Sequence, residues 1–164
     1  MLESCIKSAW RRRRPSGALV GAAALLALAG GAGAQTLADC DWVAAPGNIV
    51  EPWEENSRTY ANGAIRVARL STGGEPVCCS EHLLILHPSG EEEGPPYRAC
   101  SVLSQERGLG WLRVHVQEIA SSYDPAKGLL LQVPVGHYDG VAGEGRREVV
   151  GVRINQATGT ATLE

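Results

Sequence analysis

The chain has 164 residues, a formal net charge of −3, five cysteines and no phenylalanine. A chain of this length can bury one hydrophobic core and is typical of a single domain. Its acidic balance argues against nucleic acid as a partner, because phosphates need a basic face, and against binding to anionic membrane surfaces.

The N-terminus has the pattern of a secretory signal peptide over residues 1–34. Lys7 and Arg11–Arg14 precede an apolar run over residues 17–30, and Ala32-Gly33-Ala34 provides small residues for cleavage. The apolar run is shorter than the roughly twenty residues of a membrane span, although an uncleaved N-terminal anchor is an alternative. Cleavage leaves 10 basic and 17 acidic residues, a formal charge of 10 − 17 = −7. We therefore predict a periplasmic or secreted protein without a membrane segment after cleavage.

Residues 35–56 have no clear period. Pro46, Gly47 and Pro52 interrupt this segment, which predicts an irregular lead-in rather than a regular element. A β domain is predicted to follow over residues 57–164.

The β domain begins with two short β-prone runs around Asn62-Gly63, two residues that tolerate the positive φ angles of a tight hairpin. The continuous apolar run Leu83–Leu86 predicts a strand that is covered on both faces. Residues 97–104 form the next predicted strand. Residues 111–120 alternate as a strand does, with Arg113 and His115 outward, although a helix also fits the apolar spacing.

Two later segments share one turn pattern. "YDPAKGLLLQVPV" and "INQATGTATLE" both place a glycine, Gly128 or Gly159, where a short hairpin with a bulge requires positive φ. Including a strand over residues 147–154, the pattern gives seven to eight short strands. This count predicts an all-β fold, either a small antiparallel sandwich or a barrel.

Four cysteines remain after cleavage, Cys40, Cys78, Cys79 and Cys100, and an even number in an exported chain favours disulfides. If residues 77–87 form a strand, neighbouring side chains point to opposite faces, and adjacent Cα atoms about 3.8 Å apart lie too close for a usual disulfide. Two disulfide connectivities therefore remain open. They are Cys40–Cys78 with Cys79–Cys100, and Cys40–Cys79 with Cys78–Cys100.

Histidines supply an alternative function. His82 and His87 follow the cysteine pair, and zinc or copper accepts such ligands. On a strand, however, these side chains do not converge with the two sulfurs. His115 could act as a general base only beside a nucleophile or carboxylate. A metal-handling protein or a small periplasmic enzyme using these histidines is thus the second hypothesis, and we predict no cofactor.

The aromatic residues suggest where a partner could bind. If Trp53 or Trp111 is exposed, it would be an anchor for a protein or glycan. Because no catalytic motif is found, the first hypothesis is an exported, disulfide-stapled β domain with a binding or structural role in the cell envelope. Its predicted partner is an envelope protein or a glycan.

Overall fold

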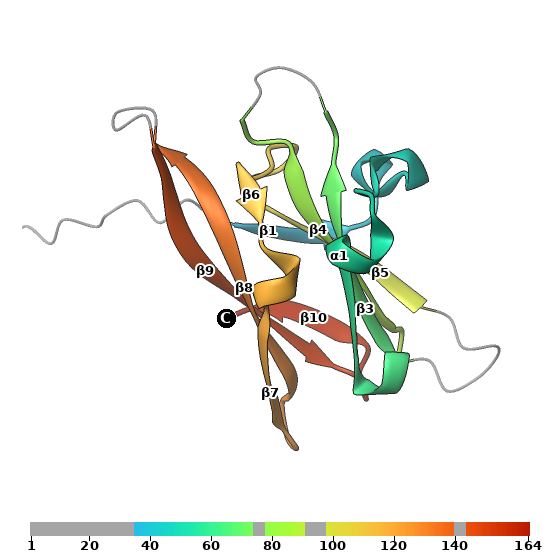
Figure 1. Cartoon of the computed structure of the whole chain (residues 1–164). Coiled ribbons are helices and arrows are strands. Elements are labelled where there is room, and N and C mark those ends of the chain that lie inside the picture. The colour runs from blue at the N-terminus through green and yellow to red at the C-terminus, as the bar shows by residue number, and fades with distance from the viewer. Residues whose placement is uncertain (1–34, 74–77, 91–97, 140–143) are drawn as a thin grey trace, which may run out of the picture. The chain divides into compact units, whose positions relative to one another are not determined.

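The computed structural model describes residues 35–73, 78–90, 98–139 and 144–164 (Figure 1). The predicted signal peptide lies outside the described residues. The described chain folds into two antiparallel five-stranded sheets and shows no closed barrel. The all-β prediction is therefore confirmed.

The first sheet combines the N-terminal segment with the strands around the cysteine pair. Its spatial order is β1 (Thr36–Asp39), β5 (Arg98–Ser104), β4 (Glu81–Pro88), β3 (Ile65–Ser71) and β2 (Ser57–Tyr60). Strand β4 lies in the centre of this sheet, and Leu83, Leu84 and Ile85 are all buried. The prediction of a strand covered on both faces is confirmed here.

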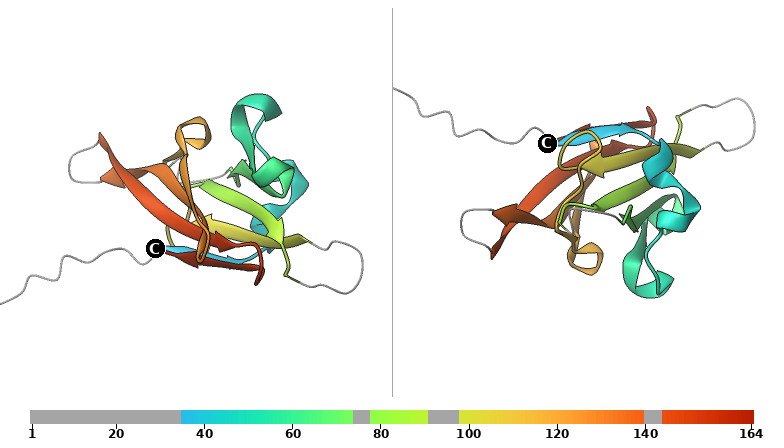
Figure 2. Two further views of the ribbon diagram at one scale, coloured as in Figure 1. Left: turned by 90° about the horizontal axis from the view of Figure 1, so that it is seen from below. Right: turned by 90° about the horizontal axis from the view of Figure 1, so that it is seen from above.

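The second sheet is built around one long hairpin (Figure 2). Its order is β10 (Thr160–Leu163), β9 (Glu144–Asn155), β8 (Gly128–Asp139) and β6 (Arg113–Val114), and β7 (Ala120–Asp124) also pairs with β8. The predicted turns at Gly128 and Gly159 are present, with φ angles of 93° and 67°. In both turns the side chain that begins the turn, Asp124 or Asn155, accepts hydrogen bonds from two following backbone N–H groups.

The main core lies between the two sheets. It joins buried residues of β3, β4 and β5, such as Ile65 and Leu103, to a larger apolar set that includes Trp111, which precedes β6, and Leu131 of the second sheet. A smaller cluster covers the other face of the first sheet, where Val43 packs with Leu70, Leu84 and Val102. A buried leucine or valine contributes about 1.5–3 kcal/mol, so the two clusters together are the main source of stability.

The N-terminal segment is more regular than the predicted lead-in. Besides β1, residues 35–56 contain two 3₁₀ turns, η1 (Trp42–Ala44) and η2 (Pro46–Asn48), and the short helix α1 (Trp53–Asn56). Strand β1 pairs with β5 along its whole length, and a disulfide between Cys40 and Cys100 joins the two strands at this point. The segment therefore belongs to the folded domain.

Two connections differ from the predicted ones. The chain turns between β2 and β3 through four residues that include η3 (Ala61–Gly63), in place of a two-residue hairpin, although Asn62 and Gly63 do adopt positive φ. Residues 111–120 form only the short strand β6 and the 3₁₀ turn η4 (Val116–Glu118) before β7 begins. Within the described ranges, no helix is long and apolar enough to cross a membrane.

Candidate functional site

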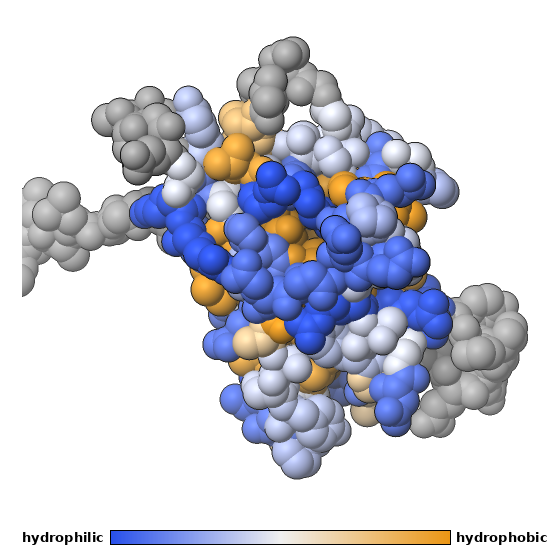
Figure 3. All heavy atoms as spheres, viewed as in Figure 1, coloured by the Kyte–Doolittle hydropathy of each residue, from blue (hydrophilic) through white to orange (hydrophobic). Residues whose placement is uncertain are grey.

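A group of arginines gathers where β6 and η4 lie beside both sheets. We call this surface the arginine face and define it by Arg69, Arg113, Arg146 and Arg147 together with His115. Two shallow hollows open on it, of about 330 Å³ and about 380 Å³, and both are lined by Arg113 and His115. In Figure 3 this side of the molecule carries a band of hydrophilic side chains over β6, η4 and α1, with apolar atoms visible between them.

Several residues that line the first hollow are bonded to a buried carboxylate. Glu81, 7% exposed, accepts two hydrogen bonds from the Arg69 guanidinium and one from the backbone N–H of Val114 at 2.7 Å. Asn56 completes the group, since its side-chain oxygen accepts a 3.2 Å hydrogen bond from Arg69. These bonds satisfy both charges and fix β6 against β3 and β4, as a buried ion pair requires.

The second hollow has a floor without side chains. Gly136 of β8 pairs with Arg113 of β6 on one side and with Arg147 of β9 on the other. Residues that pair directly across antiparallel strands project from the same face, so the two arginines stand on either side of a glycine. A Cβ at Gly136 would already lie 3.3 Å from the Arg113 Cβ. The missing side chain therefore creates the hollow.

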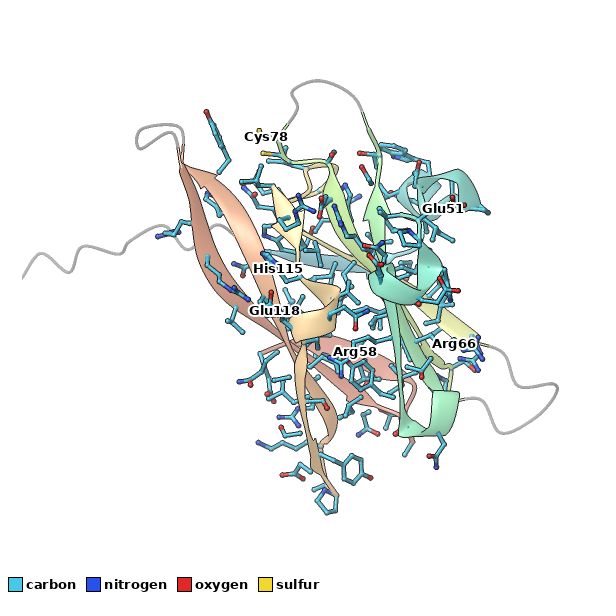
Figure 4. All side chains as sticks on the ribbon, viewed as in Figure 1. Glu51, Arg58, Arg66, Cys78, His115 and Glu118 are labelled. Atoms are coloured by element: carbon cyan, nitrogen blue, oxygen red, sulfur yellow. A yellow bond between two sulfur atoms is a disulfide. The ribbon has the colours of Figure 1, made fainter. Side chains whose placement is uncertain are left out.

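The charges of the second hollow are only partly neutralised. Among the described residues that line it, three are arginines, one is His115 and none is acidic. Glu118 lies beside it and receives a hydrogen bond from Arg147, with His115 Nδ1 at 3.3 Å from its other oxygen. The hydrogen bond from Arg147 and the nearby positive charges lower the pKa of the exposed Glu118 carboxyl. Figure 4 shows His115 and Glu118 close together, at the start and the end of the η4 turn.

Two guanidinium groups keep unused hydrogen-bond donors. Within the part of the chain that the structure describes, the Arg113 guanidinium makes one polar contact, a 3.8 Å approach to Glu81, and Arg146 has no polar partner. The Glu81 oxygens are already bonded to Arg69 and Val114. Guanidinium groups bind carboxylate and phosphate oxygens in pairs of hydrogen bonds. The arginine face can therefore accept an anionic group.

The predicted histidines do not come together. His82 and His87 are buried on opposite faces of β4, because five residues separate them on one strand, while His115 belongs to the arginine face. His87 bonds to Pro88 O and Ser101 Oγ. No group of three or more possible metal ligands is present among the described residues. Of the residues proposed for the alternative function, only His115 lies at the candidate site.

His82, near the start of β4, and Ser104, at the end of β5, form a buried pair. His82 Nδ1 lies 2.7 Å from Ser104 Oγ, and burial lowers the pKa of His82 although the nearby Asp41 charge opposes this shift. Ser104 and Asp41 also line a hollow of about 440 Å³ between β1 and β10. A neutral imidazole can accept a serine proton, but Ser104 is only 6% exposed and Asp41 accepts a hydrogen bond from Val43 N. This pattern is typical of buried polar groups that satisfy one another.

The cysteine pairing differs from both predicted connectivities. Cys40 bonds to Cys100, with Cα atoms 5.4 Å apart, so neither can bond to Cys78 or Cys79. The predicted alternation of the two side chains is wrong because β4 begins only at Glu81, and Cys78 and Cys79 lie in a bend before it. Cys79 has a φ angle of 77°, which is not a strand conformation.

The two tryptophans proposed as partner anchors have different fates. Trp111 is 1% exposed and packs in the main core, so the exposure that a binding role requires is missing. Trp53 is 46% exposed at the start of α1. Its role as an anchor stays a prediction.

The arginine face was not predicted from the sequence. Arg113 and His115 were predicted on the outward side of their segment, and His115 is only partly buried while Arg113 is exposed. Arg146 and Arg147 come from β9, and only the pairing of β6, β8 and β9 brings them near Arg113. The Arg146-Arg147 pair after a glycine-rich turn was the one local signal. Comparison of the chain with protein-family models, curated proteins and solved structures finds no match.

Proposed function

We propose that the mature chain is an exported binding domain of the cell envelope and that its arginine face binds an acidic segment of a partner protein. The observation that carries this proposal is the second hollow, where Arg113 keeps unused donors beside a glycine floor and Arg146, which also has unused donors, contributes to the lining. The mature chain has a formal charge of 10 − 17 = −7, so a surface lined by arginines stands out from the rest.

The surroundings of the hollow favour a peptide over a glycan. Leu112, Tyr138 and Val149 are exposed on the same sheet, with exposed fractions of 36%, 44% and 57%. Apolar side chains beside arginines suit a peptide that carries both apolar and acidic residues. A glycan would favour a flat aromatic surface, and the exposed Trp42 and Trp53 belong to the N-terminal segment, outside the residues that line the hollow.

Export is supported by two independent features. The N-terminal pattern is that of a signal peptide. The folded domain contains a disulfide between Cys40 and Cys100, a bond that persists in oxidising compartments. A periplasmic or secreted location is therefore part of the proposal.

Binding is tested with a fluorescent peptide that alternates glutamate and leucine, by anisotropy. The double variant Arg113→Gln/Arg146→Gln should raise the dissociation constant at least about tenfold, since charge-assisted hydrogen bonds contribute about 1.5–3 kcal/mol each and 1.4 kcal/mol is a factor of ten. Affinity of the unmodified protein should fall as salt is raised, because the charges are exposed and screened.

The matched control is Arg66→Gln/Arg107→Gln, which removes the same charge from exposed positions outside the arginine face. Its affinity should stay near that of the unmodified protein. Equal losses in both double variants would mean that net charge alone attracts the peptide, and the proposed site would be rejected. Binding of an acidic polysaccharide in place of the peptide would also contradict the proposal.

A further inference from the structure

Cys78 and Cys79 lie together in the bend before β4, where Figure 4 labels Cys78. Both residues are partly exposed, so small molecules in solution can reach them. Their Sγ atoms are 2.6 Å apart. Unbonded carbon atoms prefer about 3.5–4.0 Å, and sulfur is larger than carbon, so this distance is too short for two independent thiols.

Backbone hydrogen bonds at Cys79 and Ser80 hold the pair in this arrangement. Cys79 O accepts a 2.7 Å hydrogen bond from Gly110 N, and Ser80 O accepts one of 3.0 Å from Thr72 N. The positive φ angle of Cys79 turns its side chain out of the alternation of a strand. The two sulfurs can therefore lie on one side of the chain, which an extended backbone would not permit.

No other cysteine of the described residues is available to pair with Cys78 or Cys79. Cys40 and Cys100 are bonded 60 residues apart in sequence. The one remaining cysteine, Cys5, belongs to the predicted signal peptide. We propose that Cys78 and Cys79 form a reversible disulfide between neighbouring residues, and that the reduced pair is a dithiol site that exchanges with disulfides in solution. The Cα atoms of neighbours lie about 3.8 Å apart, closer than in a usual disulfide, so this bond is strained and more easily reduced.

The exchange follows ordinary thiol–disulfide chemistry. The Cys78 thiolate attacks a sulfur of an external disulfide R–S–S–R, which forms a Cys78–S–S–R bond and releases one RS⁻. The Cys79 sulfur then attacks Cys78 Sγ, loses its proton and releases the second RS⁻. Two thiols are oxidised to one disulfide, the external disulfide is reduced to two thiols, and the two protons pass to the solvent or the released thiolates.

The order of these two steps follows from the environment of Cys79. Burial first, and then the hydrogen bond and charge of Cys78, raise the pKa of the Cys79 thiol to about 11. Cys79 is therefore protonated at neutral pH, and Cys78 is the sulfur that we expect to attack the external disulfide. Cys79 then forms the disulfide with Cys78 within the same bend, where the short distance between the two sulfurs favours ring closure.

Peptide mapping tests the proposal directly, because trypsin separates the relevant cysteines. Cleavage after Arg69 and Arg98 gives one peptide, residues 70–98, that contains Cys78 and Cys79 but neither Cys40 nor Cys100. The folded chain is mildly reduced and treated with oxidised glutathione. It is then denatured in the presence of iodoacetamide, which labels free thiols, and digested with trypsin. We expect peptide 70–98 to be lighter than its reduced form by two hydrogen atoms and to carry no label.

Cys78→Ser is the matched variant. Its peptide should carry one iodoacetamide or one glutathione on Cys79, because the second sulfur is missing. A peptide 70–98 from the unmodified protein that carries two labels or two glutathione groups would overturn the proposal. So would a crosslink from this peptide to the one that contains Cys100 or to the one that ends at Arg58. The experiment does not depend on export or on the arginine face.

Discussion

At the residue scale, His82 links the stability of the fold to pH. Its ring is 1% exposed and bonded to Ser104, and burial lowers its pKa. In the unfolded chain the pKa of a histidine is about 6.5. Below that pH the unfolded state binds a proton that the folded state resists, so stability is lost as pH falls from about 6.5 toward the lower pKa of the folded protein.

The lowered pKa of His82 in the folded state gives a testable prediction. Urea unfolding between pH 8 and pH 5 should show a free energy of unfolding that falls below about pH 6.5, with a slope of at most about 1.4 kcal/mol per pH unit from His82. His82→Asn, which keeps a polar side chain near Ser104, should reduce that slope. An unchanged slope in the variant would assign the pH dependence to other groups.

Some single residues could be interpreted from the sequence, and others could not. Leu83 and Ile85 are buried as the apolar run predicts, because burial of a strand depends on composition that the sequence states directly. The burial of Trp111 and the pairing of the cysteines could not be predicted in this way. Whether a tryptophan is core or surface, and which sulfurs meet, depends on strand register, and one sequence does not reveal that register.

At the scale of single elements, the segment 111–120 shows why alternating patterns mislead. Val114 and Val116 are buried as the strand pattern predicts, but Leu112 is 36% exposed. The 3₁₀ turn η4 then places Val116 and Ile119 in the same core, at the helical spacing that the alternative had suggested. Each pattern describes part of the segment, because β6 and β7 both pair with β8 and the 3₁₀ turn η4 connects these two short strands.

The hairpin between β7 and β8 depends on one glycine. Gly128 has a φ angle of 93°, and a Cβ there would lie 2.2 Å from Ile154 O of the neighbouring strand β9. Gly128→Ala should therefore lower the free energy of unfolding by at least about 2 kcal/mol, from backbone strain of about 1–3 kcal/mol plus the collision. Chemical denaturation measures the loss.

Gly63→Ala is the control for that prediction. Gly63 has a similar φ angle of 84°, but a Cβ there would meet no atom within 4 Å. Its cost should be limited to the conformational strain of about 1–2 kcal/mol. If both variants lose the same free energy, the close approach of β9 to Gly128 contributes nothing.

At the scale of the whole molecule, the arginine face arises only when the sheets assemble. Arg69 comes from β3, Arg113 from β6 and Arg147 from β9, and the pairing of Gly136 with two arginines depends on the register of three strands. The sequence could predict the fold class and the turns at Gly128 and Gly159, because local patterns determine them. It could not predict the candidate site, whose residues are distant in sequence and carry no shared motif.

The two cysteine pairs enclose very different lengths of chain, and they therefore differ in their effect on the stability of the whole molecule. The Cys40–Cys100 bond spans 60 residues and fixes β1 on β5. In the chain-entropy model a loop of this length contributes about 4 kcal/mol, whereas a bond between adjacent residues closes almost no loop. Under oxidising conditions, Cys40→Ala/Cys100→Ala should therefore lower the free energy of unfolding by about 4 kcal/mol, and Cys78→Ala/Cys79→Ala by much less. Urea unfolding distinguishes them, and similar losses would show that the loop between β1 and β5 is not the source of the difference. A large loss in the first variant alone would assign the structural role to one pair and leave the other available for redox exchange.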